Sequence, residues 1–172
     1  MIIEHVAQSN GLPKQFVLGI CKTESNLDRW AMRFEPDYRW LWDVHANRGY
    51  KARDQDMTLD RAPADFPASP GLTTHTEWIG QHTSYGVMQV MGSLAREFGF
   101  KGFFTQLCDV YTCCDIGCRY LVQLRDKYLH QYGWQGVASA YNAGSINLAA
   151  GGKFVNQAYP DAVEKNGGFL GL

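Results

Sequence analysis

Apolar residues recur along this chain with the period of an α-helix near both ends and lose that period in the middle. In residues 13–25, Val17, Ile20, Cys21 and Glu24 are spaced at i, i+3, i+4 and i+7, which places them on one face of a helix. Partial burial on that face penalises the ionised form of a carboxyl group. We therefore expect Glu24 to keep its proton to a higher pH than a free glutamate, as a general acid requires. The plainer alternative is a solvated glutamate, or one paired with an arginine.

The same period predicts the other helices. Pro13 suits the first turn of the helix that carries Glu24, because its fixed φ matches a helix start. In residues 109–132 apolar and aromatic side chains recur every four positions, so this long helix is expected to cross the core. Further helices are predicted at residues 2–8, 88–98, 134–143 and 157–165.

Residues 34–82 lack this periodicity and are rich in aromatic residues, charges and prolines. The prolines exclude long helices across much of the segment, so we expect a long, irregular, insertion-like region. Aromatic residues in and just before it could form a wall on which sugars stack, although packing is their commoner role. This aromatic cluster consists of Trp30, Phe34, Tyr38, Trp40 and Trp42. Aspartates from Asp54 onward alternate like a calcium loop, but Leu59 stands where that loop needs glycine, so calcium is not expected.

Composition narrows the class of protein. A chain of 172 residues with 45% hydrophobic and 19% charged residues fits one soluble domain. The net charge of -1 argues against nucleic acid or anionic lipid as a partner. The opening residues lack a basic start followed by a long apolar segment, so neither a signal peptide nor a membrane span is predicted. We expect synthesis in the cytosol and a monomer.

Four of the five cysteines lie between Cys108 and Cys118, and the other is Cys21. An odd number in a chain without a predicted signal peptide argues for reduced thiols rather than a disulfide framework. Cys114 and Cys118 at i and i+4 could face a metal, but a buried free cysteine more often acts as a small apolar residue. A nucleophilic cysteine paired with a histidine has no local pattern to support it. No metal and no cofactor are expected.

Three short motifs lie far apart along the chain, and their order carries information. They are Glu24-Ser25, Ser84-Tyr85-Gly86-Val87-Met88-Gln89-Val90-Met91, and Ala140-Tyr141-Asn142-Ala143-Gly144. In this order the chain resembles the soluble lytic transglycosylase family (SLT domain), and most of all its small bacteriophage-encoded members, which the run Arg33-Phe34-Glu35-Pro36 also resembles. The resemblance implies a mainly α fold of the lysozyme-like α+β superfamily. Residues 1–172 are then a single helical domain with a substrate cleft and a long irregular insertion at about 34–82.

The resemblance also assigns roles to residues. Glu24 would be the sole catalytic acid and base, and Tyr141 with Asn142 would stand near it. Gln89 is favoured by its own chemistry, because an amide among apolar neighbours needs hydrogen-bond partners, and sugar hydroxyl and amide groups would suit. The methionines and glycines could instead serve packing and tight turns. The full set of expected substrate-binding residues is Ser25, Met88, Gln89, Met91, Tyr141, Asn142 and Tyr159.

The activity that the resemblance implies is cleavage of peptidoglycan between N-acetylmuramic acid and N-acetylglucosamine. The β-1,4 bond would break with formation of a 1,6-anhydromuramoyl end, which consumes no water. A second carboxylate facing Glu24 would permit hydrolysis to reducing ends instead, as in a muramidase or endolysin. The acids of the insertion-like region keep that alternative open. They are Glu35, Asp37, Asp43, Asp54, Asp56, Asp60, Asp65 and Glu77.

The chain departs from the family in two further places. Pro160 follows Tyr159 where the family usually has valine, and the acidic residue expected shortly before the tyrosine is absent, so Tyr159 is a weaker candidate than Tyr141. Gly92 stands where the family usually has proline, which loosens the start of the following helix. Besides a transglycosylase and a muramidase, a third hypothesis is a virion protein that binds glycan without cleaving it. A protein made in the host cytoplasm would reach peptidoglycan through a membrane lesion or as part of a particle, which suits a phage enzyme used in lysis or at the start of infection.

Overall fold

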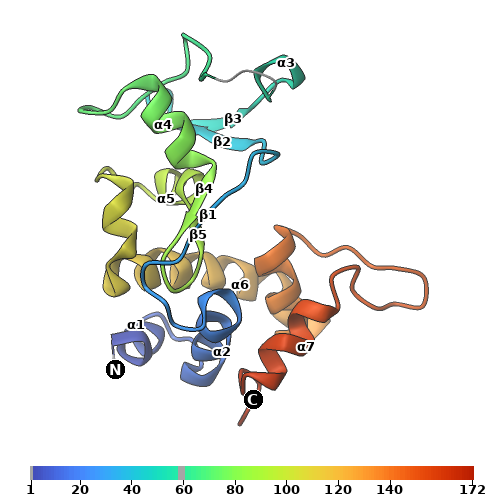
Figure 1. Cartoon of the computed structure of the whole chain (residues 1–172). Helices are drawn as coiled ribbons and strands as arrows, with labels where there is room; N and C mark the ends of the chain where they lie inside the picture. Colours follow the sequence, from blue (N-terminus) through green and yellow to red (C-terminus); the bar gives the residue numbers. More distant parts are fainter. Residues whose placement is uncertain (1, 58–60) are drawn as a thin grey trace.

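The computed structural model describes residues 2–57 and 61–172, which form a mainly helical fold with two small sheets (Figure 1). This confirms the predicted fold class. The helices are α1 (Ile2–Ser9), α2 (Lys14–Ser25), α3 (Asp54–Met57), α4 (Thr74–Gln81), α5 (Gly92–Glu97), the 3-10 helix η1 (Phe104–Cys108), α6 (Val110–Ala143) and α7 (Ala158–Lys165). The strands are β1 (Met32–Phe34), β2 (Trp40–Asp43), β3 (Arg48–Lys51), β4 (Thr83–Tyr85) and β5 (Val90–Met91).

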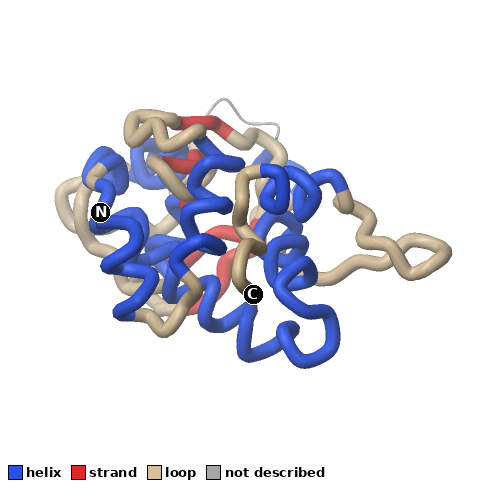
Figure 2. The backbone as a smooth tube through the Cα atoms, turned by 90° about the horizontal axis from the view of Figure 1, so that it is seen from below, coloured by secondary structure: helices blue, strands red, loops and turns tan. Residues whose placement is uncertain are grey.

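Four helices, α1, α2, α6 and α7, form a helical base that holds the larger core (Figure 1, Figure 2). The apolar face of α2 is fully buried at Phe16, Val17 and Ile20, as its spacing predicts. Pro13 precedes the first residue of this helix, and Asn26 ends it in the left-handed conformation. Burying such side chains stabilises the fold by about 1.5–3 kcal/mol each, so the amphipathic stripe explains why α2 lies against the base.

Helix α6 crosses the middle of the molecule, as expected for the long helix of the second half (Figure 1). Its path breaks at Gly133, where φ is 62° and ψ is -169°. The two helices predicted on either side of this glycine are therefore the two arms of α6. The loop from α6 to α7 projects from the body of the protein (Figure 2).

A three-stranded antiparallel sheet of order β1-β4-β5 joins the base to the upper part of the molecule. One prediction is wrong in this region: residues 88–98 were expected to form a single helix, and they do not. A turn ends at Gln89, strand β5 follows, and only Gly92–Glu97 is helical. Gly86 and Gln89 adopt positive φ angles of 69° and 48°, which no helix accommodates. The apolar run is a strand and a helix in succession, which periodicity alone does not separate.

Residues 35–57 and 61–82 form an upper part that we call the hairpin lobe (Figure 1). Long loops are present, as expected, but the lobe also contains the β2–β3 hairpin and helices α3 and α4. A small second core fills it, made of Leu41, Ala52, Phe66 and Trp78. Of the predicted calcium-like aspartate run, residues 58–60 lie outside the described residues.

Buried polar groups join the elements of the hairpin lobe to one another and fasten the lobe to α5. Arg96 donates to both carboxylate oxygens of Glu77 at 2.7 and 3.0 Å, and both side chains are almost completely buried. Gln81 pairs through its amide with the backbone of Trp42. Such a network is costly to break, because each group would remain buried without a partner. Among the helices of the described chain, none is long and apolar enough to span a bilayer.

Candidate active site

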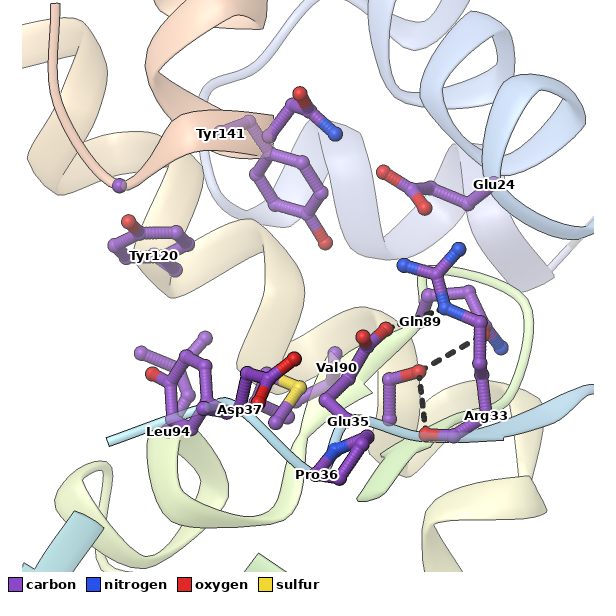
Figure 3. A pocket seen from close by; sticks show the side chains of 15 residues that line it. Glu24, Arg33, Glu35, Pro36, Asp37, Gln89, Val90, Leu94, Tyr120 and Tyr141 are labelled. Atoms are coloured by element: carbon purple, nitrogen blue, oxygen red, sulfur yellow. Dashed lines mark hydrogen bonds and ion pairs between the residues drawn. The ribbon is translucent and has the colours of Figure 1, made fainter. Parts of the chain in front are cut away.

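A cleft of about 360 Å³ lies where the sheet, the end of α2 and the second arm of α6 meet (Figure 3). Of the predicted site residues, Glu24, Gln89, Met91, Tyr141 and Asn142 line it. Ser25, Met88 and Tyr159 do not. The other lining residues are Arg33, Glu35, Pro36, Asp37, Tyr38, Ser84, Val90, Leu94, Tyr120 and Gly144.

Glu24 lies in the last turn of α2 and points into the cleft (Figure 3). Burial raises the pKa of its carboxyl group above the usual value, as the helical stripe predicts. A hydrogen bond from Tyr159 and the positive charge of Arg33 act in the opposite direction on this pKa. The carboxyl group therefore keeps its proton to higher pH than a free glutamate, while two neighbours are placed to stabilise its ionised form.

The two tyrosines expected near Glu24 have different partners. The Tyr159 hydroxyl donates a hydrogen bond of 2.5 Å to Oε1 of Glu24. The Tyr141 hydroxyl donates to the backbone carbonyl of Met88 at 2.8 Å. Tyr159 is thus the tyrosine that holds the carboxyl group, although the sequence ranked it below Tyr141.

Gln89 lines the cleft, but its amide is already bonded within the protein. Its Oε1 accepts a hydrogen bond from the Ser84 hydroxyl at 2.9 Å. Its Nε2 donates to the carbonyl oxygens of Ala31 and Gly86 at 3.0 and 2.9 Å. The amide thus meets protein groups where sugar groups were expected. In this arrangement Gln89 fixes the β4–β5 turn against the segment before β1.

Met88 and Ser25, expected to bind substrate, instead join elements behind the cleft. Met88 is fully buried, and its thioether packs so closely on Gly117 that a β-carbon there would lie 2.6 Å from the sulfur. In the structure Met88 therefore packs in the core. The Ser25 hydroxyl donates to the carbonyl of Val87 at 2.9 Å, which ties the end of α2 to the β4–β5 turn.

Asn142 is held in place from the loop that follows α6. Its Oδ1 accepts a hydrogen bond from Nδ2 of Asn156 at 2.9 Å. Asn156 also bonds the hydroxyl and the carbonyl of Ser139, which is buried inside α6. These contacts fix the wall of the cleft that Asn142 and Tyr141 share.

The opposite wall contains residues for which the sequence analysis gave no individual role. Arg33, the middle residue of β1, forms an ion pair with Glu35, and its guanidinium group is directed toward Glu24 (Figure 3). Asp37 and Tyr38 follow on the same segment. The sequence feature that could have indicated this wall is the run Arg33-Phe34-Glu35-Pro36. It places a cation and an acid close together at the start of the insertion-like region.

Among the candidate second carboxylates, Glu35 and Asp37 alone of those described line the cleft. Several others are occupied elsewhere by arginines: Asp54 by Arg39, Asp56 by Arg53 and Glu77 by Arg96. Asp43 accepts hydrogen bonds from backbone N–H groups in its own turn, and Asp65 is exposed. Asp60 lies outside the described residues.

All five cysteines are free and buried, as expected of small apolar residues in the core. Burial raises the pKa of the Cys113 thiol to about 12, so it stays protonated at neutral pH. Its sulfur donates to the carbonyl of Tyr85 and accepts from the N–H of Met88. In residues 2–57 and 61–172, no group of three or more His, Cys, Asp or Glu side chains is arranged to hold a metal ion.

Comparison with known proteins gives one match. The family model described as Transglycosylase SLT domain matches residues 69–159. The matched segment contains the second and third motifs and ends at Tyr159, whereas Glu24 lies before it. No curated protein and no solved structure matches the chain.

Proposed function

The chain belongs to the transglycosylase SLT domain family of peptidoglycan-cleaving enzymes, with their lysozyme-like fold, and from this we propose that it is a lytic transglycosylase whose catalytic acid and base is Glu24. The bond cleaved is the β-1,4 link between N-acetylmuramic acid and N-acetylglucosamine. The product carries a 1,6-anhydromuramoyl end. Residues 1–172 act as one domain, in which the segment from Glu35 to Tyr38 supplies one wall of the cleft.

The observation that carries the proposal is the setting of the Glu24 carboxyl group. It faces the cleft, burial raises its pKa, and a tyrosine from the matched segment donates to it. Partial burial favours the protonated form that must give a proton to a leaving oxygen. The hydrogen bond from Tyr159 and the charge of Arg33 favour the ionised form that remains afterwards.

In the first step Glu24 gives its proton to the leaving glycosidic oxygen, and the bond from that oxygen to the anomeric carbon breaks. The acetamido oxygen of N-acetylmuramic acid forms a bond to the same carbon and holds its positive charge. In the second step the ionised Glu24 accepts the proton of the C6 hydroxyl. The C6 oxygen then replaces the acetamido oxygen at the anomeric carbon and closes the anhydro ring. Glu24 is again protonated, and no water has been consumed.

The remaining lining residues position the sugar. Asn142, held by Asn156, offers an amide to the cleft, and Met91 and Tyr120 provide apolar surface. Tyr141 and Gln89 are themselves bonded to the backbone, so they shape the cleft walls more than they exchange partners. A cleft with fixed walls excludes stray water, which would otherwise compete with the C6 hydroxyl.

A muramidase is the second candidate, because Glu35 and Asp37 line the same cleft as Glu24. Either carboxylate could activate a water molecule on the far side of the sugar. Glu35 is already paired with Arg33, which leaves Asp37 as the freer base.

Mass spectrometry of a peptidoglycan digest tests both functions. The transglycosylase produces muropeptides with anhydro ends, and Glu24→Gln abolishes their release while Asp37→Asn preserves it. Reducing ends that disappear with Asp37→Asn would establish hydrolysis instead. Soluble fragments released at the wild-type rate by Glu24→Gln would refute the role of Glu24 in either reaction.

The likeness to small phage-encoded members supports a role in phage lysis or at the start of infection, with the protein acting as a monomer. Expression in a bacterial host tests this role. Lysis is expected after the inner membrane is permeabilised, and the Glu24→Gln variant should leave the cells intact. Analytical ultracentrifugation tests the monomer.

A further inference from the structure

The β2–β3 hairpin has two different faces. Leu41 is buried in the small core of the hairpin lobe, and side chains alternate along a strand, so Trp40 and Trp42 lie on the other face. Across the ladder Trp42 is paired with Gly49 and Trp40 with Lys51. Directly paired residues of an antiparallel ladder share a face. One face of the hairpin therefore presents two tryptophans, a lysine and a glycine.

This face lines a second cavity, which we call the hairpin pocket. It encloses about 360 Å³ between the hairpin and helix α5. Its lining consists of Tyr38, Trp40, Leu41, Trp42, Gly49, Tyr50, Lys51, Ser93 and Glu97. A β-carbon built on Gly49 would have no atom within 4 Å, so the space in front of Trp42 is open.

Helix α5 brings two polar residues, Ser93 and Glu97, to the wall of this pocket. Ser93 is 3% exposed, and its Oγ has no hydrogen-bond partner in the described structure. The Tyr38 phenol approaches it without reaching the geometry of a hydrogen bond. The Ser93 hydroxyl is itself closed to solvent, so the Tyr38 phenol beside it is the polar group that faces the pocket. The carboxyl group of Glu97 lies one helical turn further along the same wall.

The hairpin pocket adjoins the candidate active site. Tyr38 lines both, and the adjacent residues Leu94 and Ser93 of α5 line one each. A polymer that occupies the cleft beside Glu24 can thus extend over Tyr38 into the hairpin pocket. The hairpin wall of this pocket lies outside the segment that the family model matches, whereas the α5 wall, with Ser93 and Glu97, lies within it.

We propose that the hairpin pocket binds a further N-acetylhexosamine residue of the same glycan strand, at a distance from the bond that is cleaved. This inference rests on the proposed function. The apolar face of a pyranose ring stacks on tryptophan, and its hydroxyl and acetamido groups suit Glu97 and the Tyr38 phenol. The ammonium group of Lys51 lies 4.9 Å from the centre of the Trp40 ring and holds that ring in place.

Binding of soluble N-acetylglucosamine oligomers to the Glu24→Gln protein tests the proposal without turnover. Isothermal titration calorimetry compares chitohexaose, long enough to reach both pockets, with chitotriose. Trp42→Ala in this background should lower the affinity for chitohexaose about tenfold and change that for chitotriose less than about twofold. Unchanged affinity for chitohexaose, or an equal loss for both oligomers, would overturn the proposal.

A second variant separates loss of the pocket from loss of the hairpin. Gly49→Leu removes no contact and fills the open space before Trp42, so it should also lower chitohexaose affinity about tenfold. If Trp42→Ala lowers the affinity for chitohexaose and Gly49→Leu does not, the loss comes from a disturbed hairpin, and the proposed binding in the pocket is wrong. Trp30→Ala is the matched control, because this tryptophan is 67% exposed and lines neither pocket. It should bind both oligomers as the parent does.

The outcome is distinguishable from failure of the proposed function. Product analysis of the wild-type digest decides whether the protein makes anhydro ends, and the binding experiment requires no product. A length-dependent loss in the variants supports the hairpin pocket whichever ends the digest contains. Anhydro ends together with unchanged binding in both variants would leave the proposed function intact and remove the pocket.

Discussion

The helical base and the hairpin lobe are stabilised in different ways. In the base, apolar faces of long helices pack on one another, and Phe16, Val17 and Ile20 are completely buried. In the lobe, a small apolar core is accompanied by a buried ion pair between Glu77 and Arg96. Apolar packing of this kind tolerates exchanges that conserve side-chain volume, whereas the ion pair depends on both partners. The cleft lies where these two kinds of structure meet.

This difference assigns separate tasks to the two regions. The base supplies the proposed proton donor, Glu24, and the tyrosine that bonds it. Strand β1 supplies Arg33, and the first residues of the lobe supply the acids of the facing wall, Glu35 and Asp37. The proposed acid is thus placed by packed helices, while the acids of the facing wall come from a region held by polar contacts.

The largest effect is expected from breaking the ion pair of the lobe. Glu77→Gln leaves the Arg96 guanidinium group buried without its charge partner and should destabilise the protein by about 3–5 kcal/mol. Urea unfolding measures this loss. The control is Glu35→Gln, whose partner Arg33 is mostly exposed and whose loss should cost about 1 kcal/mol or less. Equal losses in the two variants would show that burial of the Glu77–Arg96 pair is not what holds the lobe.

A second prediction concerns the turn that joins the two regions. Gly86 has a φ of 69°, and a β-carbon there would lie 2.5 Å from the carbonyl oxygen of Leu107. Gly86→Ala should therefore destabilise the protein by about 2–4 kcal/mol and reduce activity, since the turn positions Gln89. Thermal unfolding and digestion of peptidoglycan measure the two effects.

Gly99→Ala is the matched control for that change. Gly99 also has a positive φ, of 83°, but its β-carbon would meet no atom within 4 Å. It should cost about 1–2 kcal/mol from backbone strain alone and leave the activity unchanged. If Gly99→Ala is as harmful as Gly86→Ala, close packing at the turn is not the cause.

On the base side, Tyr159→Phe removes the hydrogen bond that lowers the pKa of Glu24. That pKa should rise further, so the decline of kcat/KM on the alkaline side should move to higher pH. The second step needs the ionised carboxyl group, and kcat should fall about tenfold. A pH profile of peptidoglycan cleavage measures both. Tyr141→Phe, which loses only its bond to the Met88 carbonyl, should leave the position of the profile unchanged.

The smallest effect is expected at the wall of the cleft. Arg33 lowers the pKa of Glu24 through its charge, so Arg33→Gln should move the alkaline decline slightly to higher pH. Because the Arg33 side chain is 75% exposed, salt should screen this effect. Profiles at low and high ionic strength measure it. A shift as large as that of Tyr159→Phe and insensitive to salt would show that Arg33 bonds the carboxyl group directly.

Local sequence patterns were sufficient for the helical base and for Glu24. The spacing of Val17, Ile20 and Glu24 determines which face of α2 is buried, and that burial is what raises the pKa of the acid. The break at Gly133 is likewise visible in the sequence. These features depend on residues within a few turns of one another, so periodicity reports them directly.

Long-range pairing had to be seen in the tertiary structure. The choice of Tyr159 over Tyr141 as the partner of Glu24 joins residues 135 positions apart, and no local pattern encodes it. The same holds for the internal bonding of the Gln89 amide, the burial of Met88 against Gly117 and the approach of the hairpin to α5. The sequence by itself determined the helices of the base, the buried acid and the family resemblance. Only packing between distant elements decided which side chains reach the cleft, because a contact depends on where two backbones cross.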